Sequence, residues 1–283
     1  MYDVIVIGAG PAGISAALYA KRTGKNVLVL YYGKSNLEKS TKIENFYGFE
    51  NGIDGKTLYE NGIKQAINLG MDVKQEEVLD IKKDKEFIVE TENRRYESKA
   101  VIISTGNKKL KPNIKGIDEF EGKGISYCAI CDGFFYRNKN VAIVGDGKFA
   151  LKEAEDLKNL ANKITILTNG KQMEPIEGYQ LITKNIKEIH GDTKVSKVEF
   201  EDGSTIDIDG LFIAIGVAGG SNFAKKLGVK LQGDSIIVDD NMQTNLNGLY
   251  ACGDATGGLL QVCKATYEGA KAGLEVVKYL NSR

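Results

Sequence analysis

The chain has 283 residues, a formal net charge of zero, and a hydrophobic content of 42%, which is enough to fill compact cores. This length accommodates two domains of ordinary size. Zero net charge argues against electrostatic binding to nucleic acid or to an anionic membrane. No apolar run approaches the about 20 residues that span a bilayer, and the first residues show neither a basic region nor a signal-peptide cleavage site. We therefore expect a cytoplasmic protein that binds no nucleic acid and no membrane.

A strand, a glycine-rich turn, a helix and a second strand are predicted at the amino terminus. Residues 4–7 form an apolar run typical of a buried parallel strand, and the turn that follows reads GAGPAG. In this GxGxxG pattern the first glycine allows the tight turn, the second lets a pyrophosphate approach the backbone, and the third permits close helix–strand packing. The helix amino terminus then faces the anion. The unit predicts a dinucleotide site at Gly8, Gly10 and Gly13.

The same pattern occurs again after residue 140. An apolar strand (141–144) leads into a GxGxxA turn, a helical stretch (150–160) and another strand (164–167). Two copies of one nucleotide-binding architecture indicate two domains, and segments 111–113 and 217–220 are candidate hinges because they contain Pro or Gly. We predict an α/β fold of two Rossmann-like three-layer βα domains, the second inserted into the first. The first domain is expected to comprise residues 1–112 and 217–283, and the inserted domain residues 113–216. Further strands are expected at 87–90, 99–104 and 211–216, and a final helix at about 261–280.

Only Cys128 and Cys131, of the four cysteines, have the spacing of a motif. In a reducing cytosol a Cys-x-x-Cys pair is more often catalytic or metal-binding than a structural disulfide. A zinc site would need further Cys or His at ligand spacing, and His190 is the only histidine, so we predict no metal. We interpret the pair as a redox-active disulfide, with Asp132 placed to move the proton that exchange requires. Two further cysteines are expected to be small buried residues: Cys252 and Cys263.

Together the two motifs resemble those of the low-molecular-weight thioredoxin reductases. The matching segments are 8–13, 43–45, 104–106, 128–137, 248–254 and 261–262. The resemblance implies an FAD-dependent homodimer that reduces thioredoxin and rotates its inserted domain between two orientations. Cys131 would face the flavin C4a atom, Cys128 would exchange with thioredoxin, and Asp132 would act as acid and base. Cofactor contacts would come from Gly8, Gly10, Pro11, Ala12, Gly13, Asn36, Asn45, Thr105, Gly106, Asp254 (at the ribitol), Gln261 and Val262.

The inserted domain departs from this family where NADPH is usually bound. The family's Gly-Gly-Gly-x-Ser-Ala turn here contains Asp146 and Phe149, and its His-Arg-Arg triplet reads Thr-Asn-Gly at 168–170. Two lost arginine contacts weaken binding of the 2′-phosphate about 10²- to 10⁴-fold. No acidic residue is present there for an NADH ribose, and Lys171 is a poor substitute for an arginine fork. The segment 171–198 is also short for the second half of such a domain.

These departures predict that pyridine nucleotide binding has been lost. In this respect the chain resembles the ferredoxin-dependent flavin thioredoxin reductases, in which reduced ferredoxin feeds the flavin. Two alternatives stay open: an NADPH-dependent reductase with an atypical nucleotide site, and a non-catalytic flavin redox sensor. FAD is expected although residues 31–37 lack the acidic residue and the Gly-Gly-Gln-Leu segment usual for the family. A group of lysines is either a basic dock for ferredoxin or a solvated charged loop: Lys108, Lys109, Lys111 and Lys115.

Overall fold

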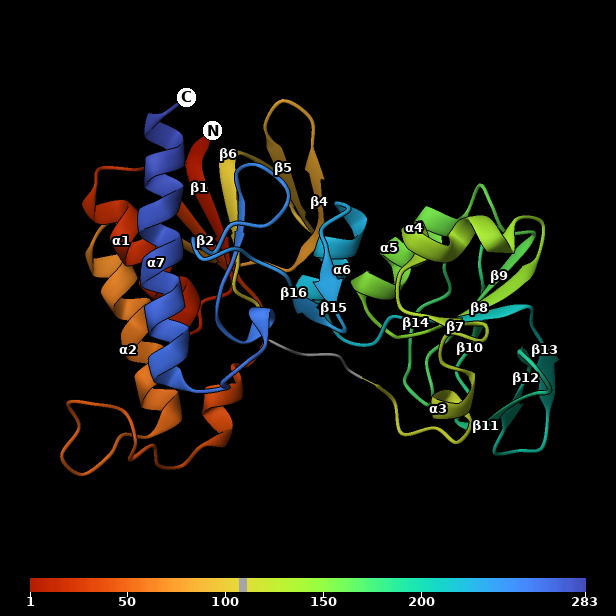
Figure 1. The fold of residues 1–283 in the computed structure, drawn as a ribbon. Helices are drawn as coiled ribbons and strands as arrows, with labels where there is room; N and C mark the ends of the chain where they lie inside the picture. Colours follow the sequence, from red (N-terminus) through yellow and green to blue (C-terminus); the bar gives the residue numbers. More distant parts are fainter. Residues whose placement is uncertain (107–110) are drawn as a thin grey trace. The chain divides into compact units, whose positions relative to one another are not determined.

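The structure is a computed structural model that describes residues 1–106 and 111–283. The chain divides into two compact units, Met1–Lys108 with Gly219–Arg283, and Lys109–Ala218. Each unit is built on a sheet with parallel strands and flanking helices, and the second interrupts the sequence of the first (Figure 1). The predicted fold class is therefore confirmed. Among the described helices, none is both long and apolar enough to cross a membrane.

The sheet of unit 1 has the strand order β3-β2-β1-β6-β5-β4, and β17 pairs with β6. Its central strands are parallel, and Val4 lies opposite Val27 on one side and Ala100 on the other. Val4, Val27 and Ala100 are almost entirely buried, as expected for parallel strands covered on both faces. The strands are β1 (Tyr2–Ile7), β2 (Val27–Tyr31), β3 (Asp72–Gln75), β4 (Val78–Lys83), β5 (Phe87–Thr91), β6 (Arg95–Ile103) and β17 (Leu249–Ala251).

Helices α1 (Pro11–Arg22) and α7 (Val262–Asn281) pack against each other beside this sheet (Figure 1). Gly269 of α7 makes the close approach possible, because a Cβ there would lie 2.1 Å from the carbonyl oxygen of Ala12. The first turn of α1 is thereby fixed against α7. Two predicted cofactor residues lie at the start of α7, because Gln261 is its N-cap and Val262 its first residue. The remaining elements of unit 1 are α2 (Gly55–Asn68), α6 (Gly220–Lys226), η1 (Asn36–Lys39), η3 (Gly253–Thr256), β15 (Leu231–Gln232) and β16 (Ser235–Ile236).

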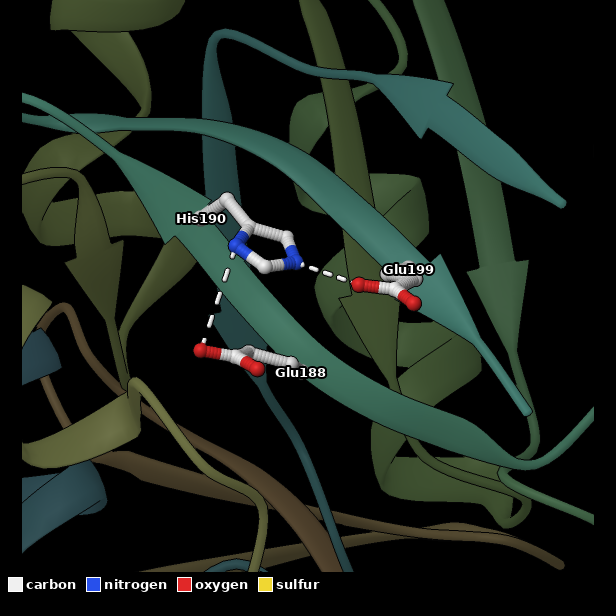
Figure 2. Close-up of side chains that lie close together, drawn as sticks. All are labelled: Glu188, His190 and Glu199. Carbon is white, nitrogen blue, oxygen red and sulfur yellow. Dashed lines mark hydrogen bonds and ion pairs between the residues drawn. The ribbon is translucent and has the colours of Figure 1, made fainter. Parts of the chain in front are cut away.

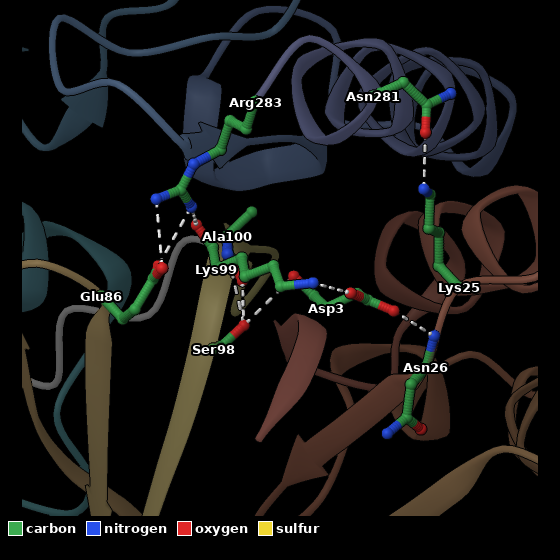
Figure 3. A network of polar contacts seen from close by, with 9 residues as sticks. All are labelled: Asp3, Lys25, Asn26, Glu86, Ser98, Lys99, Ala100, Asn281 and Arg283. Carbon is green, nitrogen blue, oxygen red and sulfur yellow. Dashed lines mark hydrogen bonds and ion pairs between the residues drawn. The ribbon is translucent and has the colours of Figure 1, made fainter.

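A polar network holds the carboxy terminus of α7 against the sheet (Figure 3). The two terminal nitrogens of Arg283 donate to the two carboxylate oxygens of Glu86 at 3.0 and 3.1 Å, a bidentate arrangement. Nearby, Lys99 Nζ lies 2.8 Å from Asp3 Oδ1, and Asp3 Oδ2 accepts the backbone N–H of Asn26 at 2.9 Å. The network links β1, β6 and the chain end to the β4–β5 hairpin.

Unit 2 contains a five-stranded sheet of order β10-β9-β8-β14-β7, in which every paired strand is parallel. Helix α5 (Lys148–Leu157) connects β8 to β9, whereas residues 168–179 connect β9 to β10 without a helix. The second half of this Rossmann-like unit is thus reduced, as the short segment after residue 171 predicted. The strands are β7 (Ile125–Ser126), β8 (Asn140–Val144), β9 (Lys163–Leu167), β10 (Gln180–Ile182) and β14 (Gly210–Ile213).

An antiparallel three-stranded sheet of order β11-β12-β13 completes unit 2. Its buried residues Ile189 and Val198 pair across the sheet and join the same core as Leu211 of β14. The core of unit 2 is therefore shared by both of its sheets. The remaining elements are β11 (Ile186–Gly191), β12 (Val195–Phe200), β13 (Thr205–Asp207), α3 (Ile117–Phe120), α4 (Ala129–Asp132) and η2 (Gly133–Tyr136).

Candidate functional site

The glycines of the first turn differ in what surrounds them. Gly8 has φ +112°, and a Cβ there would lie 2.3 Å from the carbonyl oxygen of Ser104, while a Cβ on Gly13 would lie 1.9 Å from the carbonyl oxygen of Gly8. In contrast, a Cβ on Gly10 would meet no atom within 4 Å. Gly8 and Gly13 are therefore required by the backbone itself, whereas Gly10 borders open space.

The amino terminus of α1 opens onto this space. Gly10 is the N-cap and Pro11 the first helical residue, no side chain caps the helix, and the first turn contains no acidic residue. The N–H groups of a first turn have no partner within the helix and attract anions. The arrangement fits a pyrophosphate such as that of FAD. Ser104, which the sequence analysis did not single out as a contact, fixes the turn to β6: its hydroxyl lies 2.9 Å from the Ile7 carbonyl oxygen.

Several other predicted cofactor residues lie at strand exits or loops of unit 1. The structure brings two of them together, because the Asn45 side-chain amide donates to Gln261 Oε1 at 2.9 Å. Val262 follows as the first residue of α7, and Thr105 is half-buried at the exit of β6. Asn36 is exposed at the start of η1. The remaining predicted residues are Ala12, which is buried, and Gly106, which follows Thr105.

Asp254 presents a half-buried carboxyl group in η3. Among the residues that the structure describes, none donates a hydrogen bond to its carboxylate, and burial raises its pKa, with Glu268 adding to the shift and Lys264 opposing it. Lys264 Nζ donates to the carbonyl oxygen of Gly253 at 2.7 Å, and Glu268 accepts the Gly253 N–H at 2.9 Å. These two residues of α7 hold η3 in place and leave the Asp254 carboxylate for a ligand such as the hydroxyls of a ribitol.

Lys264 and Glu268 are site residues that no sequence motif marks, although their spacing is a signal. They are four residues apart within the predicted final helix, which places them on one face, and their charged groups lie 3.0 Å apart. The sequence pattern does not show which loop this face of the helix contacts, because that depends on the fold.

Cys128 and Cys131 form a disulfide whose Cα atoms are 5.3 Å apart. Cys128 is the N-cap of the single turn α4, and its Sγ accepts the backbone N–H of Cys131 at 3.3 Å. Cys128 is buried and Cys131 is exposed. The two sulfurs of the pair are therefore not equally accessible.

The carboxyl group of Asp132 is coupled to Cys128 through a serine. Ser126 Oγ donates to Asp132 Oδ2 at 2.6 Å and accepts the backbone N–H of Cys128 at 3.1 Å. Ser126 is buried, so this contact fixes the direction of the Asp132 side chain relative to the redox pair. On another side of the turn, Glu153 Oε2 accepts the N–H of Ala129 at 2.5 Å. Sequence reasoning identified neither Ser126 nor Glu153.

The second glycine turn is flanked by polar contacts between side chains of its own unit. Asp146 Oδ2 accepts a hydrogen bond from Lys171 Nζ at 2.7 Å, which places an ion pair at the turn after β8. Thr168 Oγ1 donates to the carbonyl oxygen of Lys171 at 2.5 Å, and Asn169 Oδ1 accepts the Ile186 N–H at 2.8 Å. Thr168 and Asn169, which stand where the family has the first two residues of its His-Arg-Arg triplet, thus make hydrogen bonds within unit 2.

Phe149, which the sequence pattern places in the nucleotide turn, lies instead on the buried face of α5 with an exposure of 3%. The helix begins at Lys148, so Phe149 belongs to the helix and packs into the core of unit 2. Its ring therefore does not occupy the nucleotide turn.

His190 lies between two carboxylates on the β11–β12 hairpin (Figure 2). Its Nε2 is 2.7 Å from Glu199 Oε2, and its Nδ1 is 3.9 Å from Glu188 Oε1. The sequence predicts no metal site because it has a single histidine, yet the fold places three potential metal ligands close together here. The carboxylates face different ring nitrogens, and each also pairs with a lysine, Lys187 at 2.6 Å and Lys115 at 2.9 Å. We assign no metal to this cluster.

The two lone cysteines differ from each other. Cys252 is completely buried, as predicted, and burial raises the pKa of its thiol, which keeps it protonated. Cys263 is exposed, so the prediction that it is buried is wrong. It lies in the first turn of α7, on the side of the helix that faces away from the core.

The lysine group predicted as a possible ferredoxin dock is only partly described. Lys108 and Lys109 lie outside the described residues. Lys111 contacts Asp118 and Glu121, which raise its pKa, and Lys115 pairs with Glu188. Both described lysines are thus engaged with acidic side chains of unit 2.

Comparison with known proteins places this geometry in a family. The model of the pyridine nucleotide-disulphide oxidoreductases matches residues 2–269. A thioredoxin reductase of Listeria innocua is 33% identical over 301 residues, covering 99% of this chain and 94% of the relative. The crystal structure of an atypical thioredoxin reductase from Desulfovibrio vulgaris Hildenborough is 36% identical with a TM-score of 0.91, covering 100% of this chain and 99% of that one. A ferredoxin-flavin thioredoxin reductase from Clostridium acetobutylicum is 33% identical with a TM-score of 0.73, covering 100% and 99%.

The chain therefore belongs to the pyridine nucleotide-disulphide oxidoreductase family. Within this class its function is that of a thioredoxin reductase, in agreement with the resemblance seen in the sequence. FAD is the cofactor of these proteins, and the open turn at Gly10 together with the carboxylate of Asp254 fits it.

Proposed function

We propose that this thioredoxin reductase receives its electrons from reduced ferredoxin, through FAD, and acts as a cytoplasmic homodimer. The observation that carries the choice of donor is the ion pair at the nucleotide turn of unit 2. Asp146 and Lys171 bond to each other beside the turn where a pyrophosphate would bind. An approaching phosphate would meet the Asp146 carboxylate as a like charge.

The positions that would recognise the rest of a pyridine nucleotide are also engaged. Thr168 and Asn169 bond to their own loop and to β11, and neither offers a positive charge to a 2′-phosphate. The connection from β9 to β10 has no helix, so a second helix amino terminus is missing from this part of unit 2. One of the solved relatives is described as a ferredoxin-flavin enzyme, which supports the same donor.

Redox potentials permit this route. A plant-type ferredoxin at about −400 mV lies about 130 mV below thioredoxin at about −270 mV, which for two electrons is about 6 kcal/mol downhill. When bound, FAD supplies the conversion between single electrons from an iron–sulfur protein and the electron pair that a disulfide requires. In unit 1 the first turn of α1 would bind its pyrophosphate, Asp254 its ribitol, and Asn45 with Gln261 would line the site. Further contacts are proposed from Gly8, Pro11, Ala12, Gly13, Asn36, Thr105, Gly106 and Val262.

The exchange chemistry is assigned to the pair in unit 2. Once reduced, Cys128 attacks one sulfur of the thioredoxin disulfide; a mixed disulfide forms and the other thioredoxin sulfur leaves. Cys131 then attacks Cys128 Sγ, restoring the Cys128–Cys131 bond and releasing the second thioredoxin thiol. Two electrons and two protons pass to thioredoxin, and Asp132, oriented by Ser126, is placed to move a proton. Because Cys131 is the exposed sulfur, we assign it to the flavin side, and Cys128 must become accessible after reduction.

A homodimer is supported by the surface of unit 1. Several large apolar side chains there are exposed: Tyr47, Leu259, Leu260, Tyr267 and Leu274. Large exposed apolar side chains mark an interface where they form a contiguous patch, and we propose that these residues do so. Sedimentation velocity of the purified protein tests this part of the proposal, and a monomer at micromolar concentration contradicts it.

The donor is tested by anaerobic titration of the purified flavoprotein. Excess NADPH should leave the oxidised flavin spectrum unchanged, whereas reduced ferredoxin should bleach it and support thioredoxin reduction. Rapid bleaching by NADPH contradicts the proposed donor and favours an NADPH-dependent enzyme with an atypical site. With dithionite as an artificial reductant, thioredoxin should still be turned over, and Cys128→Ser should abolish it; absence of turnover in the unmodified protein would identify a non-catalytic flavin sensor.

A further inference from the structure

A buried carboxyl group lies next to the redox pair. Helix α5 buries one face, and the residues on it are Phe149, Ala150, Glu153, Ala154 and Leu157. Four of them are apolar, and the fifth, Glu153, is only 1% exposed. A carboxyl group at a core position destabilises the fold unless strong hydrogen bonds compensate for the lost water. The hydrogen bonds of Glu153 therefore decide how much its burial destabilises the fold.

Glu153 contacts the turn that carries the disulfide. Its Oε2 accepts the backbone N–H of Ala129 at 2.5 Å. Ala129 is the first residue of α4 and directly follows Cys128. Cys128 Sγ accepts another N–H of the same turn, that of Cys131, at 3.3 Å. The unpaired N–H groups with which such a turn begins are thus shared between one sulfur and one carboxyl group.

This sharing acts on the reduced form of the pair. When the disulfide opens, Cys128 can carry a negative charge, which nearby N–H donors stabilise and a nearby carboxylate destabilises. Glu153 occupies the Ala129 donor, and its ionised form adds a charge of the same sign, so both effects oppose the charge on Cys128. In the oxidised form the sulfur is neutral, so Glu153 has little effect on it.

We propose that Glu153 is a positioning residue of the redox pair, which acts through the Ala129 N–H to disfavour the thiolate of Cys128 in the reduced enzyme. The electrons of the pair are then passed on more readily, because the reduced state is not stabilised as a thiolate. The proposal rests on the thiol–disulfide exchange at Cys128 and is independent of which donor reduces the flavin.

Other charged and titratable groups lie on the elements around α4 and stay unchanged in the test below. They are Tyr127, Asp132, Tyr136, Arg137, Lys139, Lys152 and Asp156. Asp132 is bonded to Ser126, burial raises the pKa of Tyr136 with Asp132 contributing, and Lys152 pairs with Asp156 at 3.0 Å. Glu153 differs from them because its carboxyl group bonds directly to the residue after Cys128.

The first experiment measures the alkylation of Cys128 as a function of pH. FAD-loaded protein reduced with dithiothreitol is treated with iodoacetamide, and the Cys128 peptide is quantified by mass spectrometry. In Glu153→Gln the midpoint should fall by about one pH unit, equivalent to a tenfold change in thiolate stability. The matched control is Glu155→Gln, on the same helix, where the carboxylate bonds to Tyr179 instead; its midpoint should equal that of the parent protein. An unchanged midpoint in Glu153→Gln overturns the proposal.

The second experiment separates charge from structure. The equilibrium of the Cys128–Cys131 pair with dithiothreitol is measured over the same pH range. Above both midpoints, Glu153→Gln should favour the reduced pair about tenfold, or about 30 mV for two electrons; below both, the two proteins should agree. A shift of equal size at every pH indicates a merely structural role and overturns the proposal. If Glu153→Gln folds poorly, Glu153→Met fills the same volume without charge and should give the same pH-dependent result. Neither experiment uses NADPH or ferredoxin, so failure here is distinguishable from failure of the proposed donor.

Discussion

The two glycine turns of this protein share one scaffold but differ in what fills the space above it. A Cβ on Gly8 would lie 2.3 Å from the Ser104 carbonyl oxygen, and one on Gly145 would lie 2.2 Å from that of Ala214. Both glycines are therefore needed for a backbone to pass a neighbouring strand. A Cβ on Gly10 would meet no atom within 4 Å, and one on Gly147, the equivalent glycine of unit 2, would meet only the Gly216 carbonyl oxygen at 3.6 Å. The difference lies one residue earlier, where unit 1 has Ala9 and unit 2 has Asp146 paired with Lys171. A glycine pattern thus reports the fold, and the side chains around it decide whether a nucleotide can bind.

The largest effect is expected from an alanine in the first turn. In Gly13→Ala the new Cβ would lie 1.9 Å from the Gly8 carbonyl oxygen, so we expect a loss of about 1–3 kcal/mol in the free energy of unfolding, together with loss of FAD. Gly10→Ala is the matched control, since it meets no atom within 4 Å; it should keep the stability of the apoprotein to within about 0.5 kcal/mol and still bind FAD more weakly. Urea unfolding and flavin titration measure the two quantities. Unchanged FAD affinity in Gly10→Ala would show that the pyrophosphate lies elsewhere.

A smaller, pH-dependent effect is expected at Asp254. Its pKa is raised by burial, so its favourable contribution to folding is complete below the unfolded-state pKa of about 3.9 and is lost as the pH rises through the raised folded-state value. Asp254→Asn removes the charge, and the apoprotein should become more stable at pH 7 by less than about 1 kcal/mol, since the group is only half-buried. At pH 3.5 or lower the difference should vanish. FAD affinity should fall about tenfold from loss of one charged hydrogen bond. If the difference in stability between Asp254→Asn and the parent protein is the same at both pH values, the raised pKa assigned to Asp254 is contradicted.

The smallest effect is expected at the second turn. Asp146 and Lys171 form a partly exposed ion pair, so Asp146→Ala should change the stability by less than about 1 kcal/mol. NADPH should still fail to bleach the flavin, because Thr168 remains bonded to Lys171 and Asn169 to Ile186 of β11. Lys171→Ala is the corresponding control on the other partner. Flavin bleaching by NADPH in Asp146→Ala would mean that the ion pair alone keeps the two turns different.

The sequence predicted those parts of the molecule in which the chemistry is local. The apolar runs and glycine turns at residues 4–13 and 141–150 place strand, turn and helix within a few residues of one another, and both units follow them. Helix α5 begins at Lys148 and ends at Leu157, whereas the sequence predicted residues 150–160. The difference arises because Leu160 and Ala161 already bond back to the carbonyl oxygen of Leu157 in a closing turn.

The residues that sequence reasoning missed act across long separations. Ser104 contacts Ile7, 97 residues away, and Glu153 reaches Ala129, 24 residues away. Ser104 belongs to the matching segment 104–106, but the pattern does not show which group its hydroxyl contacts, and a glutamate in a helix such as Glu153 is common. One feature of the sequence does mark Glu153, because it is a carboxylate within an otherwise apolar helical face. That feature can be interpreted only when the element that packs against the face is known. The error at Cys263 has the same origin, since the exposed side of a helix depends on what packs against it.

The exposure of Cys263 has a practical consequence. With Cys128 and Cys131 joined and Cys252 buried, a single oxidised chain, outside the proposed homodimer, offers one accessible thiol to an alkylating dye. That position, two residues after Gln261, can carry a single fluorophore without any engineered cysteine. The same thiol adds a constant background to every colorimetric thiol count, so measurements of the redox pair are best made in a Cys263→Ser background.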